Sequence, residues 1–303
     1  MAIFYKYYSH LPLEFFDEPT LKISSPIHLN DPFESLLPGD IVEYINELDE
    51  INIKNYSKEQ VIGALRDTMT MNGVISFSET QRNLLMWAHY ADDHKGMCIG
   101  FDTDEILFDD TKEKLKQYAK IQKVNYDTVR HDFFEDMKNI KKPDLLHHYI
   151  VNKVMLTKGD SWIYEKEHRY LIPTSKADYI KVKKSDLIND KKLNLTINKM
   201  MDMNVIEKCK EIKKESDYIT YVPTSSEQAA GSGYLNSNKQ VSYYLRVNPK
   251  SIKKIYFGCR APEEYTEKVK EIISKNSSMY ESLYIGKMKL DNKRFELFIP
   301  SIN

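Results

Sequence analysis

Short apolar and aromatic runs along the chain predict a set of β-strands. Some runs alternate between apolar and polar positions and others are apolar throughout, which are the patterns of half-buried and fully buried strands. The runs lie at residues 4–8, 21–24, 74–78, 97–101, 168–172, 241–247 and 251–257. Two further runs, at 283–290 and 295–299, predict a terminal hairpin around Asp291 and Asn292.

Helical patterns occupy much of the chain between these runs. Apolar residues repeat at helix spacing within residues 40–70, and the apolar segment 84–90 predicts a shorter helix. The charged segments 108–122 and 128–157, the latter broken at Pro143, and the segment 262–275 also predict helices. Because strands and helices alternate without a regular βαβ rhythm, we expect an α+β fold with mixed or antiparallel split sheets and surrounding helices.

We expect residues 1–303 to form a single domain. The length allows one large domain or two ordinary ones. Glycine and proline, at 10 and 11 residues, are too scarce for a chain rich in linkers. The Lys- and Glu-rich residues at about 180–225 predict a helical insertion on the surface, and the polar residues 224–239 predict a loop.

The amino-acid composition argues against several classes of protein. Lysine and arginine total 44 and aspartate and glutamate total 45, so the formal net charge is −1, which does not favour a general nucleic-acid or membrane binder. Cys98, Cys209 and Cys259 form no CxxC pair, which argues against a disulfide scaffold and a cysteine zinc site. With no signal peptide and no stretch of about 18 apolar residues, the sequence predicts a cytoplasmic protein without a membrane partner.

The strongest chemical pattern is an alternation of charged residues. Glu165, Glu167 and Arg169 are two positions apart, so on a strand they would point to the same face. Two neighbouring carboxylates raise the pKa of one of them, which suits a general base. Arg169 could bind a phosphate or hold a glutamate in place. The alternative is that all three lie on the solvated face of an edge strand.

Other motifs are less specific. Trp87, His89 and Tyr90 form a cluster in which His89 could act as an acid, a base or a phosphate contact, while Trp87 and Tyr90 could equally pack into the core. Asn30 begins a sequence, Asn-Asp-Pro-Phe-Glu, that predicts a turn, and its amide could bind a ligand. The sequence has no Gly-x-Ser-x-Gly elbow and no glycine-rich phosphate loop, which disfavours a hydrolase triad, an NTPase and a dehydrogenase.

Several ordered segments together resemble a known family. They read FYKYYS at 4–9, LNDPFE at 29–34, SFSE at 76–79, LMWAHY at 85–90, DHKGMCIGF at 93–101 and WIYEKEHR at 162–169. They resemble a bacterial and phage family catalogued as domain of unknown function 2971, from Phe4 to about Ile299. The family name itself implies no chemistry.

The order of these segments is also similar to that of ADP-ribosyltransferases, whose first strand often reads like Tyr-His-Tyr-Thr-Ser. By this resemblance, Lys6 stands at the histidine position, and Ser76 and Ser78 match the middle strand. Glu167 or Glu165 matches the catalytic glutamate. The resemblance implies NAD as a substrate, a nucleic-acid or protein acceptor, and a toxin or phage-defence setting with an antitoxin or defence protein as partner.

The expected site therefore combines two catalytic carboxylates with a set of binding residues. The catalytic residues are Glu167 and Glu165, and the residues expected to bind the dinucleotide are Tyr5, Lys6, Tyr7, Asn30, Ser76, Ser78, His89 and Arg169. The hypothesis requires the carboxylates near position 167 to share a cleft with the aromatic first strand. Two alternatives remain: a non-catalytic module that senses a nucleotide or binds a partner, and a nuclease with Asp31, Glu34 and Glu167 as Mg²⁺ ligands.

Overall fold

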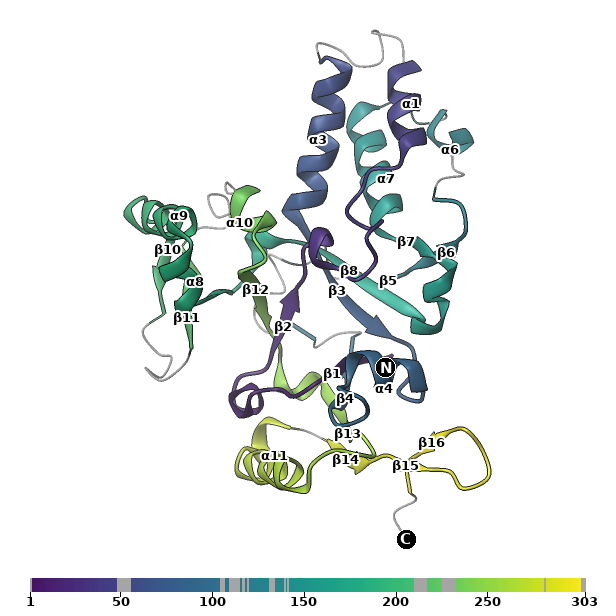
Figure 1. Ribbon diagram of the computed structural model, residues 1–303, viewed down its shortest axis with the longest axis vertical. Coiled ribbons are helices and arrows are strands. Elements are labelled where there is room, and N and C mark those ends of the chain that lie inside the picture. The colour runs from purple at the N-terminus through teal and green to yellow at the C-terminus, as the bar shows by residue number, and fades with distance from the viewer. Residues whose placement is uncertain are drawn as a thin grey trace.

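The computed structural model describes residues 2–47, 56–103, 107–108, 115, 118, 120–130, 134–138, 140, 142–209, 217–224, 233–280 and 282–300. Within these residues the chain forms helices together with mixed and antiparallel sheets, so the α+β class predicted from the sequence is confirmed (Figure 1). None of the helices in these ranges is long and apolar enough to span a membrane.

The larger sheet contains seven strands in the described part of the chain. Their order is β14 (Tyr284–Lys287), β13 (Ile252–Phe257), β4 (Met97–Asp102), β1 (Ile3–Tyr8), β3 (Asn72–Ser78), β8 (Glu167–Pro173) and β5 (Gln122–Lys123). Neighbouring strands are antiparallel except for the parallel pair β13 and β14. The first strand of the chain thus lies in the middle of the sheet, between β4 and β3.

The smaller sheet contains five strands among the described residues, in the order β10 (Ile206–Lys208), β11 (Tyr218–Pro223), β9 (Tyr179–Lys183), β12 (Val241–Arg246) and β2 (Thr20–Ile23). The segment predicted as a helical insertion at about 180–225 supplies α8 (Lys184–Asn189) and α9 (Lys191–Asp202), and also most of β9 and all of β10 and β11. Helices therefore account for only part of this segment, because its strands complete the second sheet.

The two sheets meet where β2 approaches β3. Ser24, directly after β2, forms an antiparallel bridge with Val74 of β3. One hydrophobic core spans both sheets and includes Ile23 from the smaller sheet and Phe77 and Ile99 from the larger one. The backbone of the protein thus places β1, β2 and β3 next to one another, although β2 belongs to the second sheet.

The larger sheet is split between β1 and β3. These two strands pair only at Tyr5 and Ser78, whereas β1 pairs with β4 along its whole length. The Lys6 ammonium Nζ donates a hydrogen bond to the Ser76 carbonyl oxygen at 2.8 Å, across the region where β1 and β3 no longer pair. A polar side chain rather than a backbone ladder therefore joins the two strands at this point.

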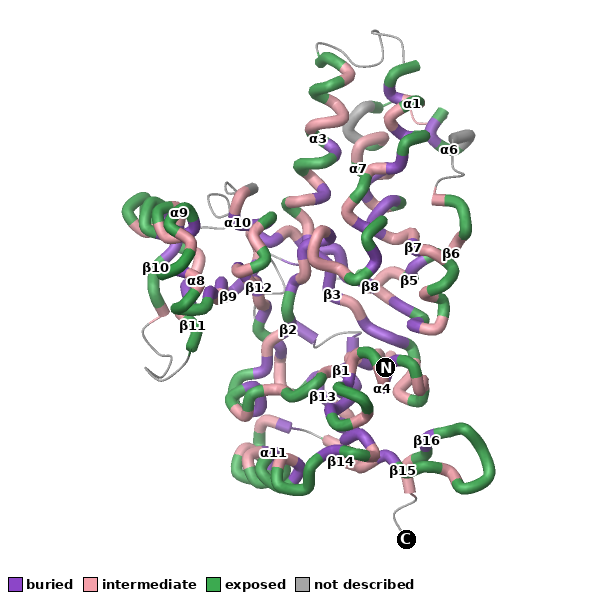
Figure 2. Tube along the Cα trace, viewed as in Figure 1, coloured by how far each residue is buried: buried purple, intermediate pink, exposed green. Residues whose placement is uncertain are grey.

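Helices cover one end of β3 and β8. Three helices, α1 (Gly39–Glu47), α3 (Lys58–Met71) and α7 (Pro143–Met155), form a second hydrophobic cluster with Val74 and Leu171 and stand together in Figure 1. Helix α3 begins with a capping box in which Ser57 and Gln60 exchange hydrogen bonds. Figure 2 shows buried segments where these helices meet the strands and exposed segments at their outer ends.

The remaining elements lie around this framework. They are β6 (Asn125–Asp127), α6 (Phe134–Lys138), β7 (Thr157–Gly159), α10 (Gly233–Ser237), α11 (Glu263–Lys275) and the hairpin of β15 (Lys289–Leu290) with β16 (Leu297–Phe298). The helix predicted at 108–122 falls mostly outside the described residues. The predicted polar loop 224–239 contains α10 within its described part.

Candidate functional site

A cavity of about 220 Å³ opens on the face of the larger sheet next to the helical cluster. It is lined by Tyr5, Lys6, Tyr7, Ser24, His28, Leu29, Asn30, Glu34, Ser76, Phe77, Ser78, Met86, Tyr90, Lys158, Glu165, Glu167 and Arg169. The aromatic first strand and the carboxylates near position 167 therefore share one cavity. Of the ten predicted site residues, only His89 is absent from this lining.

Glu165 and Glu167 reach the cavity from two different elements. Glu165 is the last residue of the 3₁₀ helix η3 (Asp160–Glu165), and β8 begins at Glu167. Lys166 between them has a φ of 46°, in the left-handed region. The sequence-based expectation that both glutamates lie on one strand is therefore wrong for Glu165, because the chain changes direction at Lys166.

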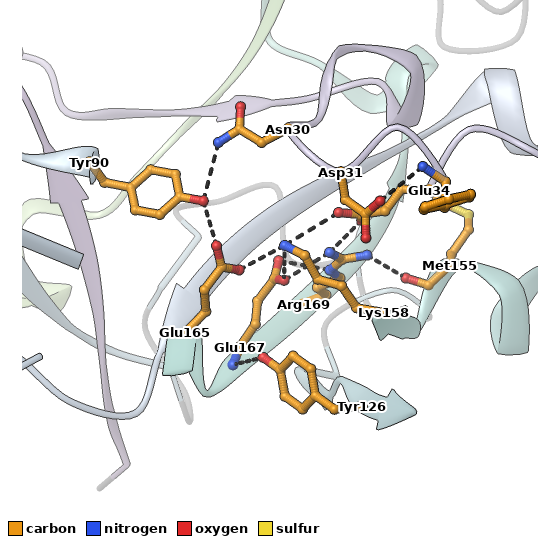
Figure 3. A network of polar contacts seen from close by, with 11 residues as sticks. Asn30, Asp31, Glu34, Tyr90, Tyr126, Met155, Lys158, Glu165, Glu167 and Arg169 are labelled. Atoms are coloured by element: carbon orange, nitrogen blue, oxygen red, sulfur yellow. Dashed lines mark hydrogen bonds and ion pairs between the residues drawn. The ribbon is translucent and has the colours of Figure 1, made fainter. Parts of the chain in front are cut away.

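Five charged side chains form a buried network in the cavity wall (Figure 3). The Lys158 ammonium Nζ lies 2.7 Å from Glu165 Oε2, 3.4 Å from Glu167 Oε2 and 3.3 Å from Glu34 Oε1. The Arg169 guanidinium binds Glu167 with two hydrogen bonds, of 2.7 and 2.8 Å, and lies 2.5 Å from Glu34 Oε2. All five residues are at most 6% exposed. Three carboxylates thus surround two cations away from solvent.

Backbone position explains why Arg169 holds Glu167. The two residues are two positions apart on β8, so their side chains share a face of the strand, as the sequence predicts. Arg169 also donates to the Met155 carbonyl at the end of α7, at 2.7 Å. The strand and the helix therefore fix the guanidinium together, and the guanidinium fixes the carboxylate.

The pKa values of Glu167 and Glu34 shift in opposite directions. Burial alone would raise the pKa of Glu167, but Arg169 and Lys158 outweigh it and lower that pKa to about 2. Burial raises the pKa of Glu34 above its ordinary value despite the same two cations. The expectation that neighbouring carboxylates would raise the pKa of one of the pair Glu165 and Glu167 is not met at Glu167, because Arg169 and Lys158 both favour its charged form, and the sequence pattern did not reveal Lys158.

Glu165 is connected to the solvent-exposed side of the cavity by a chain of hydrogen bonds. The Asn30 amide donates to the Tyr90 hydroxyl at 3.1 Å, and that hydroxyl donates to Glu165 Oε1. Burial, and then the hydrogen bond to Glu165, raise the pKa of Tyr90. Asn30 itself is exposed. The Asn30 amide and the Tyr90 hydroxyl thus donate in sequence toward the Glu165 carboxylate.

The first strand forms the opposite wall. Burial lowers the pKa of Lys6 to about 8, although Glu167 partly offsets this effect. The Tyr7 hydroxyl donates to the Thr80 carbonyl at 2.7 Å, and the Ser78 hydroxyl donates to the Glu165 carbonyl at 2.7 Å. Ser78 therefore fixes the backbone of the candidate catalytic residue, in addition to lining the cavity.

In the aromatic cluster around position 87, Trp87 packs into the core and Tyr90 lines the cavity. Trp87 is fully buried, packs edge-on against Tyr7 at 5.3 Å between ring centroids and donates to the Gln81 carbonyl. Tyr90 lines the cavity, whereas His89, one position earlier on α4 (Leu84–Tyr90), is exposed. The structure therefore brings Tyr90 but not His89 to the cavity, and the binding role of His89 stays a prediction.

The acidic set predicted for a nuclease is not assembled as a metal site. Asp31 Oδ1 accepts a hydrogen bond from the Phe33 amide, as in a turn, while Glu34 and Glu167 both lie close to the Lys158 ammonium. Within the ranges that the structure describes, no three His, Cys, Asp or Glu side chains are grouped to hold a metal ion. The Lys158 ammonium occupies the position toward which the carboxylates converge.

Sequence reasoning missed Lys158 altogether and assigned Glu34 only to the nuclease alternative. Lys158 lies in β7, a three-residue strand paired with β6, and has no motif around it. The one available signal was a lysine directly after a helix, seven residues before Glu165. Tyr126 was missed as well: its hydroxyl accepts the Glu167 amide hydrogen at 2.7 Å.

Comparison with known proteins extends this description only slightly. No curated protein and no solved structure matches the chain significantly. Residues 86–170 match the model of a family described as protein of unknown function (DUF2971). This matched segment begins in α4 and ends in β8, so it contains Tyr90, Lys158, Glu165, Glu167 and Arg169. The match shows similarity to this family over residues 86–170.

Proposed function

We propose that the cavity is the active site of an NAD-dependent enzyme similar to ADP-ribosyltransferases. One observation carries the proposal: Tyr5, Lys6 and Tyr7 of the first strand line the same cavity as Glu165 and Glu167. The resemblance of the sequence to ADP-ribosyltransferases requires this arrangement. A structure with these segments on opposite sides of the molecule would have contradicted it.

The reaction would use the carboxylates for charge stabilisation. When the bond between nicotinamide and ribose breaks, its electron pair leaves with nicotinamide and the ribose becomes oxocarbenium-like. A fixed carboxylate close to the sugar stabilises this positive charge. An acceptor oxygen or nitrogen then bonds to the anomeric carbon, and its proton passes to a carboxylate. We assign these steps to Glu165, because its carboxylate lines the cavity and is held in place by hydrogen bonds from the Tyr90 hydroxyl and the Lys158 ammonium group.

Glu167 would act mainly by holding its neighbours. Its pKa of about 2 makes it a weak base, so it is poorly suited to take a proton from an acceptor. Its carboxylate instead keeps Arg169 and Lys158 in place beside Glu165. The dinucleotide would lie between this wall and Lys6, whose ammonium suits a hydroxyl or a phosphate oxygen.

The test is the release of nicotinamide from NAD, followed by mass spectrometry. Glu165→Gln should lower the rate on the order of 10²-fold or more, because it removes the charge and keeps the shape. Glu79→Gln is the matched control, since the Glu79 side chain is 38% exposed and does not line the cavity. Circular dichroism of both variants shows whether they fold. Wild-type protein that releases no nicotinamide, or a folded Glu165→Gln variant as fast as wild type, would contradict the proposal.

A non-catalytic binding module is the second candidate. The observation that favours it is the pairing of every carboxylate in the network with a cation, which suits a rigid binding wall. Isothermal titration calorimetry with NAD separates the two candidates. Binding without nicotinamide release supports the module, and binding with release supports the transferase. A nuclease is disfavoured by the position of Lys158 among the acidic groups.

The proposed acceptor and biological role rest on the same resemblance to ADP-ribosyltransferases. The proposed acceptor is a nucleic acid or a protein, and the proposed role is that of a toxin or phage-defence effector controlled by an antitoxin or defence protein. We place the reaction in the cytoplasm, where NAD is abundant and where thiols such as the buried Cys98 stay reduced.

A further inference from the structure

The smaller sheet has one face that is only partly covered: Lys22, Lys183, Tyr218 and Arg246 are exposed on it, whereas Thr220 is buried. On β2, β9 and β12 every second side chain is buried, with exposed fractions of at most 5%: Leu21, Ile23, Ile180, Val182, Val241, Tyr243 and Leu245. The side chains between them therefore point to the other face. We call this other side of β2, β12, β9 and β11 the outer face.

Strand register places basic and aromatic residues next to one another on the outer face. Tyr244 lies opposite Lys22 on one side and opposite Tyr179 on the other. In the same way Lys183 lies opposite Tyr218. Residues directly opposite each other on paired strands share a face and contact one another. The outer face thus alternates ammonium groups with phenol rings.

Tyrosine rings hold two of these ammonium groups in place. Lys181 Nζ lies 4.8 Å from the centroid of the Tyr244 ring, and Lys183 Nζ lies 5.8 Å from that of Tyr218. Such cation–π contacts order a lysine that would otherwise be mobile. The lysines are therefore presented as an ordered row along β9.

The charge of the outer face is positive on its four strands. Lys22, Lys181, Lys183 and Arg246 are its charged side chains, and no acidic residue occupies an outer position of β2, β9, β11 or β12. Three acidic residues lie beside these strands: Glu14 and Glu18 act on Lys181, Glu18 also accepts a hydrogen bond from the Tyr179 hydroxyl, and Glu207 lies on the outermost strand β10. A chain of net charge −1 thus gathers basic residues on one sheet face.

The outer face continues into the cavity along β2. Ser24 follows Lys22 by two positions and lines the cavity. Lys22 also acts electrostatically on Lys6 and His28, which line the cavity too. A chain molecule lying on the outer face would therefore pass close to the cavity mouth.

We propose that the outer face binds a single-stranded nucleic acid and presents one nucleotide to the cavity. Single strands bind to sheets that combine basic residues, which contact phosphates, with aromatic residues, on which bases stack. Presentation to the cavity rests on the proposed transferase function and makes the nucleic acid its acceptor. Binding to the outer face is independent of that function.

Fluorescence anisotropy with short labelled single strands of RNA and of DNA tests the binding. Lys181→Ala combined with Lys183→Ala should weaken binding at least about tenfold. It should also make the fall of the logarithm of the association constant with the logarithm of salt concentration less steep by about 1.4, because each lost phosphate contact accounts for about 0.7. Tyr218→Ala should weaken it roughly tenfold through lost stacking. Lys289→Ala combined with Lys293→Ala, in the β15–β16 hairpin on the other side of the molecule (Figure 1), removes the same charge and should leave affinity unchanged.

Several outcomes would overturn the inference. The first is that the wild type binds no oligonucleotide. The second is that both double variants lose affinity equally. The third is that the protein binds a labelled poly-glutamate peptide and not the oligonucleotides, which would indicate an acidic protein partner. Nicotinamide release, measured in parallel, separates this inference from the proposed function. Turnover without oligonucleotide binding overturns only the inference. Oligonucleotide binding without turnover overturns the transferase and, with it, presentation to the cavity, and leaves binding to the outer face supported.

Discussion

The charged residues of the cavity depend on one another. A buried carboxylate or ammonium group without a partner is strongly destabilising, so each member of the network requires the others. Glu165, Glu167 and Glu34 are all within 3.4 Å of the single Lys158 ammonium group. Each of these side chains therefore has its role only within the buried network, and that role cannot be predicted from the sequence around one carboxylate.

Lys6 makes stability depend on pH in the alkaline range. Its pKa is about 8 in the folded protein and is ordinarily 10.5, because burial disfavours the charge. Between pH 8 and 10.5 the unfolded chain binds this proton more often than the folded protein does, so stability increases as pH rises through this range. We expect the free energy of unfolding of the wild type, relative to Lys6→Met, to increase over that range.

Urea unfolding at a series of pH values measures this difference. Lys293→Met, at an exposed position, is the control and should show no such pH-dependent difference from the wild type. Curves for wild type and Lys6→Met that stay parallel from pH 8 to 10.5 would contradict the pKa given for Lys6.

At the scale of residues, the sequence predicted the site where the pattern was local. Glu167 and Arg169 share a strand face because strand geometry has a period of two, and this could be seen without a structure. Lys158 could not be found in this way, because its carboxylate partners come from the 3₁₀ helix η3, strand β8 and a turn that is distant in the sequence. His89 was assigned to the site by its neighbours in sequence, but the helix carries it to solvent.

Among the elements, the turn after α4 is the most constrained by backbone. Asp92, Asp93 and His94 have φ values of 45°, 49° and 69°, in the left-handed region that ordinary residues rarely adopt. Gly96 follows, and a Cβ atom there would lie 2.1 Å from the Tyr8 carbonyl oxygen and 2.3 Å from that of Ser9. The close approach of this turn to the end of β1 therefore requires glycine.

Two glycine substitutions should have opposite effects. Gly96→Ala should destabilise the protein by roughly 1–3 kcal/mol, because backbone atoms must move to admit the methyl group. Gly63→Ala should stabilise it by roughly 0.5–1 kcal/mol, because Gly63 lies inside α3 with nothing within 4 Å of the added atom. Urea unfolding measures both. Equal effects of the same sign would show that the turn tolerates a side chain.

Elements with a strong local pattern were predicted well, and elements defined by distant partners were not. The first strand, the short helix at 84–90 and the strand at 97–101 match β1, α4 and β4. The segment 180–225 was predicted as helical because its charge and spacing suit helices, and α8 and α9 confirm that part. Its strands β9, β10 and β11 pair with one another and with β12, and the alternation of Tyr-Ile-Lys-Val-Lys in β9 is a local strand pattern that the helical prediction overlooked.

At the scale of the molecule, both sheets belong to one hydrophobic core. Residues such as Ile23, Ile180, Phe77 and Ile255 come from both sheets and pack in the same cluster. Removing either sheet would expose the apolar face of the other, which costs on the order of 25 cal/mol for each Å² of apolar surface. We therefore expect the two sheets to unfold together.

Thermal unfolding tests this expectation of one cooperative unit. Melting curves followed by far-ultraviolet and near-ultraviolet circular dichroism should coincide for the strands and the aromatic core, since the same contacts hold both. Two well-separated transitions with different aromatic signals would contradict a shared core and would support two independent units within residues 1–303.

The pairing of β2 with β12 has a consequence for biosynthesis. Leu21 lies opposite Leu245, so β2 must wait for a strand that is translated 224 residues later (245 − 21). Until then the apolar side chains of β2 emerge from the ribosome without their final cover, and closing so long a loop is slow. Exposed apolar strands of this kind are the surfaces that chaperones bind, and the cavity beside β2 would take shape only after β12 has been translated.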